Sequence, residues 1–147
     1  MNRLISVKGV TMDLARVAAI IYAIVTLGVV AFQIALAAGA PWGAHAMGGA
    51  SPGQFPPALR VAAMIQAVLL AGMAAVILAR AGLIFPGWSR VSHWLVWIVV
   101  ALTALSLALN LITPSAGERA IWAPTLALLL ISSLIVAFSS SSVTSAG

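Results

Sequence analysis

The stretch SHWLVWIVVALTALSLALNLI, residues 92–112, is apolar almost throughout and contains no aspartate, glutamate, lysine or arginine. A helix of about 20 such residues is long enough to cross the hydrocarbon core of a bilayer. Comparable apolar stretches occupy residues 14–38, 58–82 and 120–138. The sequence therefore predicts an all-α integral membrane protein, a bundle of four membrane-spanning helices.

The composition agrees with this prediction. Hydrophobic residues make up 63% of the chain and charged residues 6%, whereas about 25% of a soluble domain is charged. Cysteine is absent, which excludes disulfides, thiolate metal sites and cysteine nucleophiles. The short connections leave no room for a second unit, so we expect a single membrane domain over residues 1–147. Residues 139–147 are rich in serine, which predicts a disordered tail.

The first apolar stretch has to be distinguished from a cleaved signal peptide. Arg3, Lys8 and Arg16 precede or begin it, as in a signal sequence, but its apolar run exceeds the roughly 7–15 residues of a signal core. We therefore expect an uncleaved helix. Translation can begin at Met1 or at Met12, and in the second case residues 1–11 would be a poorly ordered extension.

The basic residues are distributed unequally between the two sides of the predicted bundle. With four spans, both termini lie on one side, together with most of the lysine and arginine residues, while Arg60 and Arg119 lie on the other. The positive-inside rule then predicts cytoplasmic termini and outward connections at 39–57 and 113–119. The net charge of +5 thus indicates topology signals and lipid contacts, not nucleic-acid binding.

Residues typical of helix starts and ends lie at the ends of these spans. Pro57 suits the first turn of the second span and Gly82 its end, while Ser89 or Ser92 can cap the third. The S-x-x-E pattern of Ser115 and Glu118 predicts a capping box for the fourth. The tryptophans close to the helix ends are typical of aromatic belts: Trp42, Trp88, Trp94, Trp97 and Trp122.

Small residues recur every four positions on the first two spans. Such spacing allows helix backbones to approach closely in lipid, so we expect these spans to form a tight antiparallel pair. The alternative is an alanine-rich composition without a packing role. The positions are Ala15, Ala19, Ala23, Ala31, Ala35 and Gly39 on the first span and Ala63, Ala67, Ala71, Ala75 and Ala79 on the second.

Polar residues gather in the outer half of the predicted bundle. Gln33, Gln66 and Asn110 all fall there. Two faces follow helical spacing: Tyr22, Thr26 and Gln33 on the first span, and Thr103, Ser106, Asn110 and Thr113 on the third. Because polar groups in lipid are costly when unpaired, two interpretations stay open. The side chains form hydrogen bonds across the bundle, each worth about 0.6 kcal/mol, or Gln33, Gln66 and Asn110 line an outward-facing polar cavity.

Arg60 and Arg119 each fall in the first turn of a predicted helix, where the helix dipole disfavours a cation. This position predicts a negative partner, which is Glu118, a lipid phosphate or an anionic ligand. The alternative is that both arginines extend to lipid headgroups while Glu118 only caps its helix.

The connection at 39–57 is rich in glycine and proline and carries His45. It is either a lid folded over the bundle, since non-helical backbone at this depth needs protein or a wet cavity around it, or a plain connector. His45 and Glu118 could act as base and acid, but their spacing matches no metal-ligand pattern. We predict no metal and no cofactor.

Several segments together resemble a group of small bacterial four-span integral membrane proteins of uncharacterised function. The resemblance covers about residues 15–138 and supports the number of spans. It implies a location in the bacterial inner membrane but no activity. The segments are residues 39–43 (GAPWG), 47–49 (MGG), 57–61 (PALRV), 109–115 (LNLITPS) and 118–124 (ERAIWAP).

The sequence favours a non-catalytic membrane protein with an outer polar pocket. Its expected partners are membrane lipids, a small anionic molecule or lipid, and a second copy or another membrane protein. One alternative is a membrane enzyme that acts on a lipid-like substrate through His45, Glu118 and Arg60, and another is a small transporter. No catalytic residue is assigned. The predicted ligand-binding residues are Arg60, Glu118, Arg119, Asn110, Gln66, Gln33 and His45.

Overall fold

The computed structural model describes residues 2–139, and this part of the chain contains helices and no strand. Three short 3₁₀ turns, Gly43–His45, Met47–Gly49 and Pro86–Trp88, lie in the connections. The predicted all-α four-helix fold is confirmed, whereas the predicted disordered tail falls, from residue 140 on, outside the described residues. The four long helices are α1 (Asn2–Ala38), α2 (Pro57–Arg80), α3 (Ser89–Ile112) and α4 (Ala116–Phe138).

Each helix carries a segment long and apolar enough to cross a membrane: Asp13–Ala38, Pro57–Arg80, Pro86–Ile112 and Ala116–Phe138. Large apolar side chains cover the outside of the bundle; Val68, Trp94 and Ile112, for example, are 70%, 74% and 77% exposed. Such surfaces require lipid, not water, around them. The chain is therefore a multi-pass membrane protein, and its third and fourth spans begin earlier than predicted.

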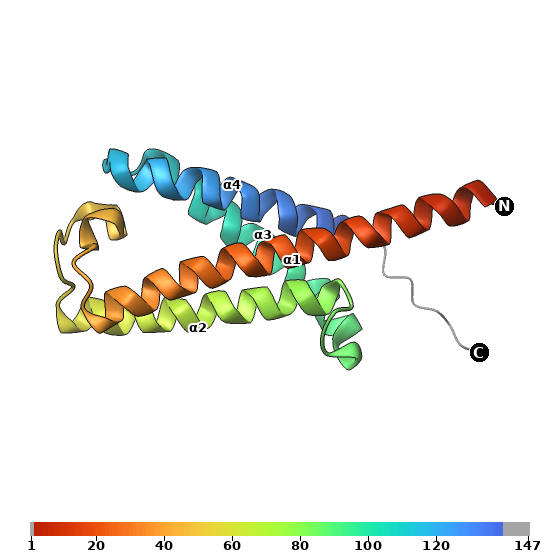
Figure 1. Ribbon diagram of the computed structural model, residues 1–147, viewed down its shortest axis with the longest axis horizontal. Helices are drawn as coiled ribbons and strands as arrows, with labels where there is room; N and C mark the ends of the chain where they lie inside the picture. The colour runs from red at the N-terminus through yellow and green to blue at the C-terminus, as the bar shows by residue number, and fades with distance from the viewer. Residues whose placement is uncertain (1, 140–147) are drawn as a thin grey trace.

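The helices form a four-membered ring in which α1 and α3 each pack on both α2 and α4 (Figure 1). The most extensive contact joins α1 and α2, so the predicted pairing of the first two spans is confirmed. The start of α1 and the end of α4 lie at one end of the bundle, here called the termini end, and α1 projects beyond it. The connection 39–56 lies at the other end, the loop end.

The first helix includes residues 2–11. The chain is helical from Asn2, and α1 continues without interruption into the membrane-spanning segment. Residues 2–11 are thus helical, whereas the start at Met1 or Met12 stays a prediction.

The alanine pattern is only partly correct as a packing signal. Ala63 and Ala67 are buried, but Ala71 on α2 and Ala31 on α1 are exposed. A helix turns by about 100° per residue, so every fourth residue is displaced by about 40° and the row winds off the contact face. The predicted helix pair is correct, but Ala31 and Ala71 face outward.

The half of the bundle toward the termini end has a closed core, and we call it the closed half. The Tyr22 hydroxyl is buried in it and shares a side-chain hydrogen bond with Thr103 of α3. A smaller cluster, Leu36, Phe55, Ala46 and Ala63, attaches the connection 39–56 to α1 and α2. The core residues of the closed half are Ala18, Ala19, Tyr22, Ile77, Val96, Val99, Leu129, Val136 and Ala137.

Most of the predicted helix-end signals are found. Pro57 begins α2, and Gly82, with φ +72°, follows its end in a Schellman-type turn. The prediction for α3 was wrong, because the helix begins at Ser89 itself and the Ser92 hydroxyl donates to the Ser89 carbonyl. The backbone N–H of Glu118 donates to Ser115 Oγ over 3.2 Å, which forms half of the predicted capping box.

Candidate functional site

A cavity of about 250 Å³ lies between the helices at the loop end. Each helix contributes one strongly polar side chain to its lining: Gln33 from α1, Gln66 from α2, Asn110 from α3 and Glu118 from α4. Four of the seven predicted ligand-binding residues thus line one cavity. Its remaining walls are mainly apolar or aromatic, from Val29, Phe32, Ala46, Met47, Leu70, Leu109, Trp122, Leu126 and Leu129, with Ser106 and Thr125.

The cavity reaches into the membrane-spanning part of the bundle. Gln66 lies nine residues after the start of α2, which corresponds to about 14 Å along the helix. Glu118 lies in the first turn of α4 and marks its shallow side. The polar lining therefore extends from the end of the bundle to about the middle of the hydrocarbon core of a bilayer.

Two buried amide oxygens in this lining have no hydrogen-bond partner. Gln33 is 6% exposed and its Oε1 atom is unpartnered. Asn110 donates from Nδ2 to the Ser106 carbonyl over 3.0 Å, which fixes its amide with Oδ1 as a buried, unpartnered acceptor. A third such atom, Thr26 Oγ1, lies deeper on α1 and outside the cavity lining.

These amides do not fasten the helices to one another. Within residues 2–139, the side chains of Gln33 and Gln66 form no hydrogen bond, and Asn110 bonds only within its own helix. The hypothesis of amide bonds across the bundle was therefore wrong for these three residues. All three instead line the cavity, and its outward orientation stays a prediction.

Glu118 is 7% exposed and holds its carboxylate at the cavity. Thr113 Oγ1 donates to its Oε2 atom over 3.4 Å, and Oε1 has no partner in the described part of the chain. The carboxylate does not complete the capping box, and the positive end of the α4 dipole stabilises its negative charge. Glu118 is the one formally charged side chain in the cavity lining.

Arg60 and Arg119 lie outside that lining and form no ion pair with Glu118 among residues 2–139. Arg119 Nη1 donates to the Thr113 carbonyl at the end of α3 over 2.8 Å. Arg60 Nε donates to the Phe55 carbonyl over 2.8 Å, and its guanidinium packs 3.1 Å from the position of a Cβ on Gly39, just beyond α1.

Both arginines thus sit at the carboxyl-terminal end of the preceding helix, where the dipole favours a cation. At the termini end, Arg80 of α2 lies at the carboxyl-terminal end of α4, where its Nη2 atom donates to the Ser139 carbonyl over 2.7 Å. Backbone carbonyls thus accept hydrogen bonds from Arg60 and Arg119, whereas Glu118 pairs with neither within residues 2–139. A lipid phosphate or an anionic ligand at these side chains stays a prediction.

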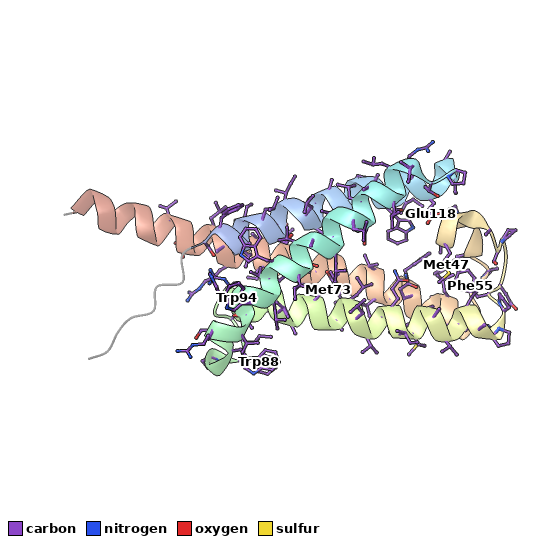
Figure 2. All side chains as sticks on the ribbon, turned by 180° about the vertical axis from the view of Figure 1, so that it is seen from behind. Met47, Phe55, Met73, Trp88, Trp94 and Glu118 are labelled. Carbon is purple, nitrogen blue, oxygen red and sulfur yellow. The ribbon has the colours of Figure 1, made fainter. Side chains whose placement is uncertain are left out.

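The connection 39–56 forms one wall of the cavity, which favours the lid over the plain connector. Ala46 and Met47 belong to the lining, and Trp122 Nε1 donates to the His45 carbonyl over 2.6 Å. A Cβ on Gly43 would overlap the Ser51 carbonyl oxygen, so the connection folds tightly on itself. Figure 2 places Met47, Phe55 and Glu118 together at this end, far from Trp88 and Trp94.

Trp122 is a site residue that the sequence interpretation missed, because it was assigned to the aromatic belt. Its ring meets that of Phe32 edge to face, with 4.8 Å between the ring centroids, and both line the cavity. The spacing of residues along α4 could have indicated that Trp122 faces the site. Trp122 and Thr125 lie four and seven residues after Glu118 and therefore on the same helix face.

His45 is not part of the cavity lining. It is exposed and packs beside Gly117, 3.4 Å from the position of a Cβ there. Of the three residues considered for catalysis, His45, Glu118 and Arg60, only Glu118 lines the cavity. Residues 2–139 contain no group of three or more histidine or acidic side chains able to hold a metal ion.

No protein-family model matches the chain, and no curated protein or solved structure does so. The function is therefore inferred from the geometry and charge of the cavity.

Proposed function

We propose that this chain is a multi-pass protein of the bacterial inner membrane that binds a small molecule in the loop-end cavity without covalent chemistry. One observation carries the proposal: Gln33 Oε1 and Asn110 Oδ1 are buried in the cavity lining without partners. An unsatisfied buried polar group costs about 1–3 kcal/mol. A ligand that donates hydrogen bonds would offset this cost, and nothing else in the described chain does.

The shape of the site supports binding over catalysis. Apolar and aromatic walls with a few polar groups are the usual composition of ligand pockets. Catalysis by general acid and base needs two such groups within reach of one substrate, whereas Glu118 has neither His45 nor Arg60 beside it in the lining. The enzyme alternative therefore lacks a second catalytic group.

The orientation of the site follows from the distribution of basic residues. With cytoplasmic termini, the loop end faces outward and the cavity opens toward the outer leaflet. Labelling of a single cysteine at Ser51 in intact cells with a membrane-impermeant reagent tests this orientation. Protection of that cysteine, with labelling of one at Gly87, would invert it.

Native mass spectrometry of the purified protein tests the binding function. Wild type should carry a small molecule that is lost from Gln33→Leu, because leucine fills the space but offers no acceptor. Gln54→Leu is the matched control, since Gln54 is an exposed amide on the connection and lies outside the cavity lining. It should keep the ligand.

The thermal stability of the same variants shows whether the Gln33 amide binds a ligand or stabilises the packing of the helices. If Gln33 serves a ligand, Gln33→Leu should be as stable as wild type without ligand, or more stable. Identical ligand profiles in all three proteins, together with a lower stability of Gln33→Leu, would make the amide a packing group and refute the proposal.

A further inference from the structure

The charge inside the cavity differs in sign from the charge at the surface of this end. Arg60 and Arg119 donate to backbone carbonyls outside the cavity lining. Glu118 is therefore the only formally charged side chain in the lining. A charge in a site shielded from water acts more strongly than one at the surface. The cavity is therefore electrostatically suited to a cation.

The uncharged polar atoms point to the same ligand chemistry. Asn110 presents Oδ1 as a buried acceptor, because one Nδ2 hydrogen is donated to the Ser106 carbonyl and this bond fixes the amide. Gln33 Oε1 is a second buried acceptor without a partner. With the free Glu118 oxygen, the lining presents three unpartnered acceptors. The amide donors of Gln33 and Gln66 are also unbonded in the described chain but neutral, so the Glu118 charge gives the site its preference for a ligand with N–H or O–H donors. A primary ammonium group has three donors and no acceptor.

The remaining walls accommodate a compact apolar body attached to that group. Phe32 and Trp122 supply aromatic rings, whose faces attract cations, tryptophan most strongly. A cavity of about 150 Å³ is large enough for benzene, so the 250 Å³ here can hold a single ring or a short alkyl chain with an aminomethyl group.

We infer that the loop-end cavity selects a small organic ammonium ion, with Glu118 as its counter-charge and Asn110 and Gln33 as further acceptors. This inference rests on the proposed binding function and names the class of its ligand. It replaces the anionic molecule expected from the sequence. The ammonium group can belong to a soluble amine or to the ethanolamine headgroup of a lipid.

Three ligands of nearly equal size test the inference: benzylamine, which is protonated at neutral pH, benzyl alcohol and benzoate. Their binding is measured by equilibrium dialysis against the full chain in phosphatidylcholine nanodiscs, with empty nanodiscs subtracted. Benzylammonium should bind about ten-fold more tightly than benzyl alcohol, because charge-assisted hydrogen bonds are roughly twice as strong as neutral ones. Benzoate should bind most weakly.

The variant Glu118→Gln tests the negative charge of the carboxylate, because it keeps the shape of the side chain and an oxygen that accepts from Thr113. It should reduce the affinity for benzylammonium to about that for benzyl alcohol, while the affinity for the alcohol changes by less than about two-fold. Asp13→Asn is the matched control, since Asp13 is the other acidic residue of the chain and is exposed on α1. It should retain the preference.

Replacing part of the phosphatidylcholine by phosphatidylethanolamine identifies the source of the ammonium group. A weaker apparent affinity for benzylammonium would assign the site to the lipid headgroup, and an unchanged affinity would assign it to a soluble amine. Either result supports an ammonium ligand.

The outcomes separate this inference from the proposed function. If benzyl alcohol binds and Gln33→Leu abolishes that binding, but benzylammonium has no advantage or benzoate binds more tightly, the cavity is a binding site for another ligand class and the inference fails. If none of the three ligands binds, both fail. The wild-type series decides the preference even if Glu118→Gln does not fold.

Discussion

The two halves of the bundle use polar side chains in different ways. In the closed half, Tyr22 and Thr103 share a hydrogen bond between α1 and α3, and Thr103 Oγ1 also donates to the Val99 carbonyl over 2.8 Å. At the loop end, Gln33 and Asn110 occupy the same faces of the same helices, yet their acceptors are unpartnered. Helical spacing therefore predicts that polar groups face inward, but the space between the helices decides whether they fasten the bundle or face a ligand.

The largest expected difference between the halves is their response to added volume. Ala19→Leu should lower the free energy of unfolding by about 2–3 kcal/mol, because Ala19 is fully buried in the closed core and overpacking there forces side chains and backbone apart. Ser106→Leu adds volume to the cavity and should cost less than about 1 kcal/mol. Unfolding by sodium dodecyl sulfate from mixed micelles measures both.

Ala31→Leu is the control for volume added to the lipid-facing surface, since Ala31 lies on the same helix and is exposed. It should change the free energy of unfolding by less than about 0.5 kcal/mol. A loss for Ser106→Leu as large as that for Ala19→Leu would mean that the loop end is packed as densely as the closed half.

A smaller effect is expected at the termini end, where Arg80 donates to the Ser139 carbonyl beyond α4. Arg80→Met keeps much of the apolar stem but removes the charge, and should cost about 1.5 kcal/mol, the lower range for a hydrogen bond from a charged group. The matched change Arg90→Met affects an exposed arginine and should stay within about 0.5 kcal/mol. Equal effects would show that the α4 end does not depend on Arg80. Thermal unfolding in detergent measures this pair.

Local sequence signals predict what depends on one helix at a time. Apolar length predicts the four spans, Pro57 and Gly82 predict the ends of α2, and spacing predicts the inward faces that carry Gln33 and Asn110. Glu118 could be associated with these amides because all lie toward one end. The fold and most of the polar lining follow from such rules.

Contacts between distant segments explain what the sequence did not predict. The dipole argument judged Arg60 and Arg119 by the helix that carries each, but the structure brings them to the ends of α1 and α3. Trp122 also donates a hydrogen bond to the connection 39–56, and no spacing within α4 reveals that contact. The alanine row failed at Ala71 because packing follows the helix surface and not the repeat.

The smallest predicted effect tests the comparison most directly, because it sets one inward polar group against another on α1. Tyr22→Phe removes a hydroxyl that is hydrogen-bonded across the bundle and keeps the buried ring. It should lower the free energy of unfolding by about 0.6 kcal/mol, the average for such bonds between membrane helices. Gln33→Leu, which removes an unpartnered acceptor, should have no such cost without ligand.

A double-mutant cycle with Thr103→Val identifies the cause of the loss at Tyr22. If the shared hydrogen bond is responsible, Thr103→Val should make the added cost of Tyr22→Phe vanish, because the bond is already absent. Fully additive losses would mean that the hydroxyl contributes through other contacts. A loss for Gln33→Leu equal to that for Tyr22→Phe would remove the distinction between a fastening group and a binding group, since both polar side chains would then stabilise the bundle in the same way.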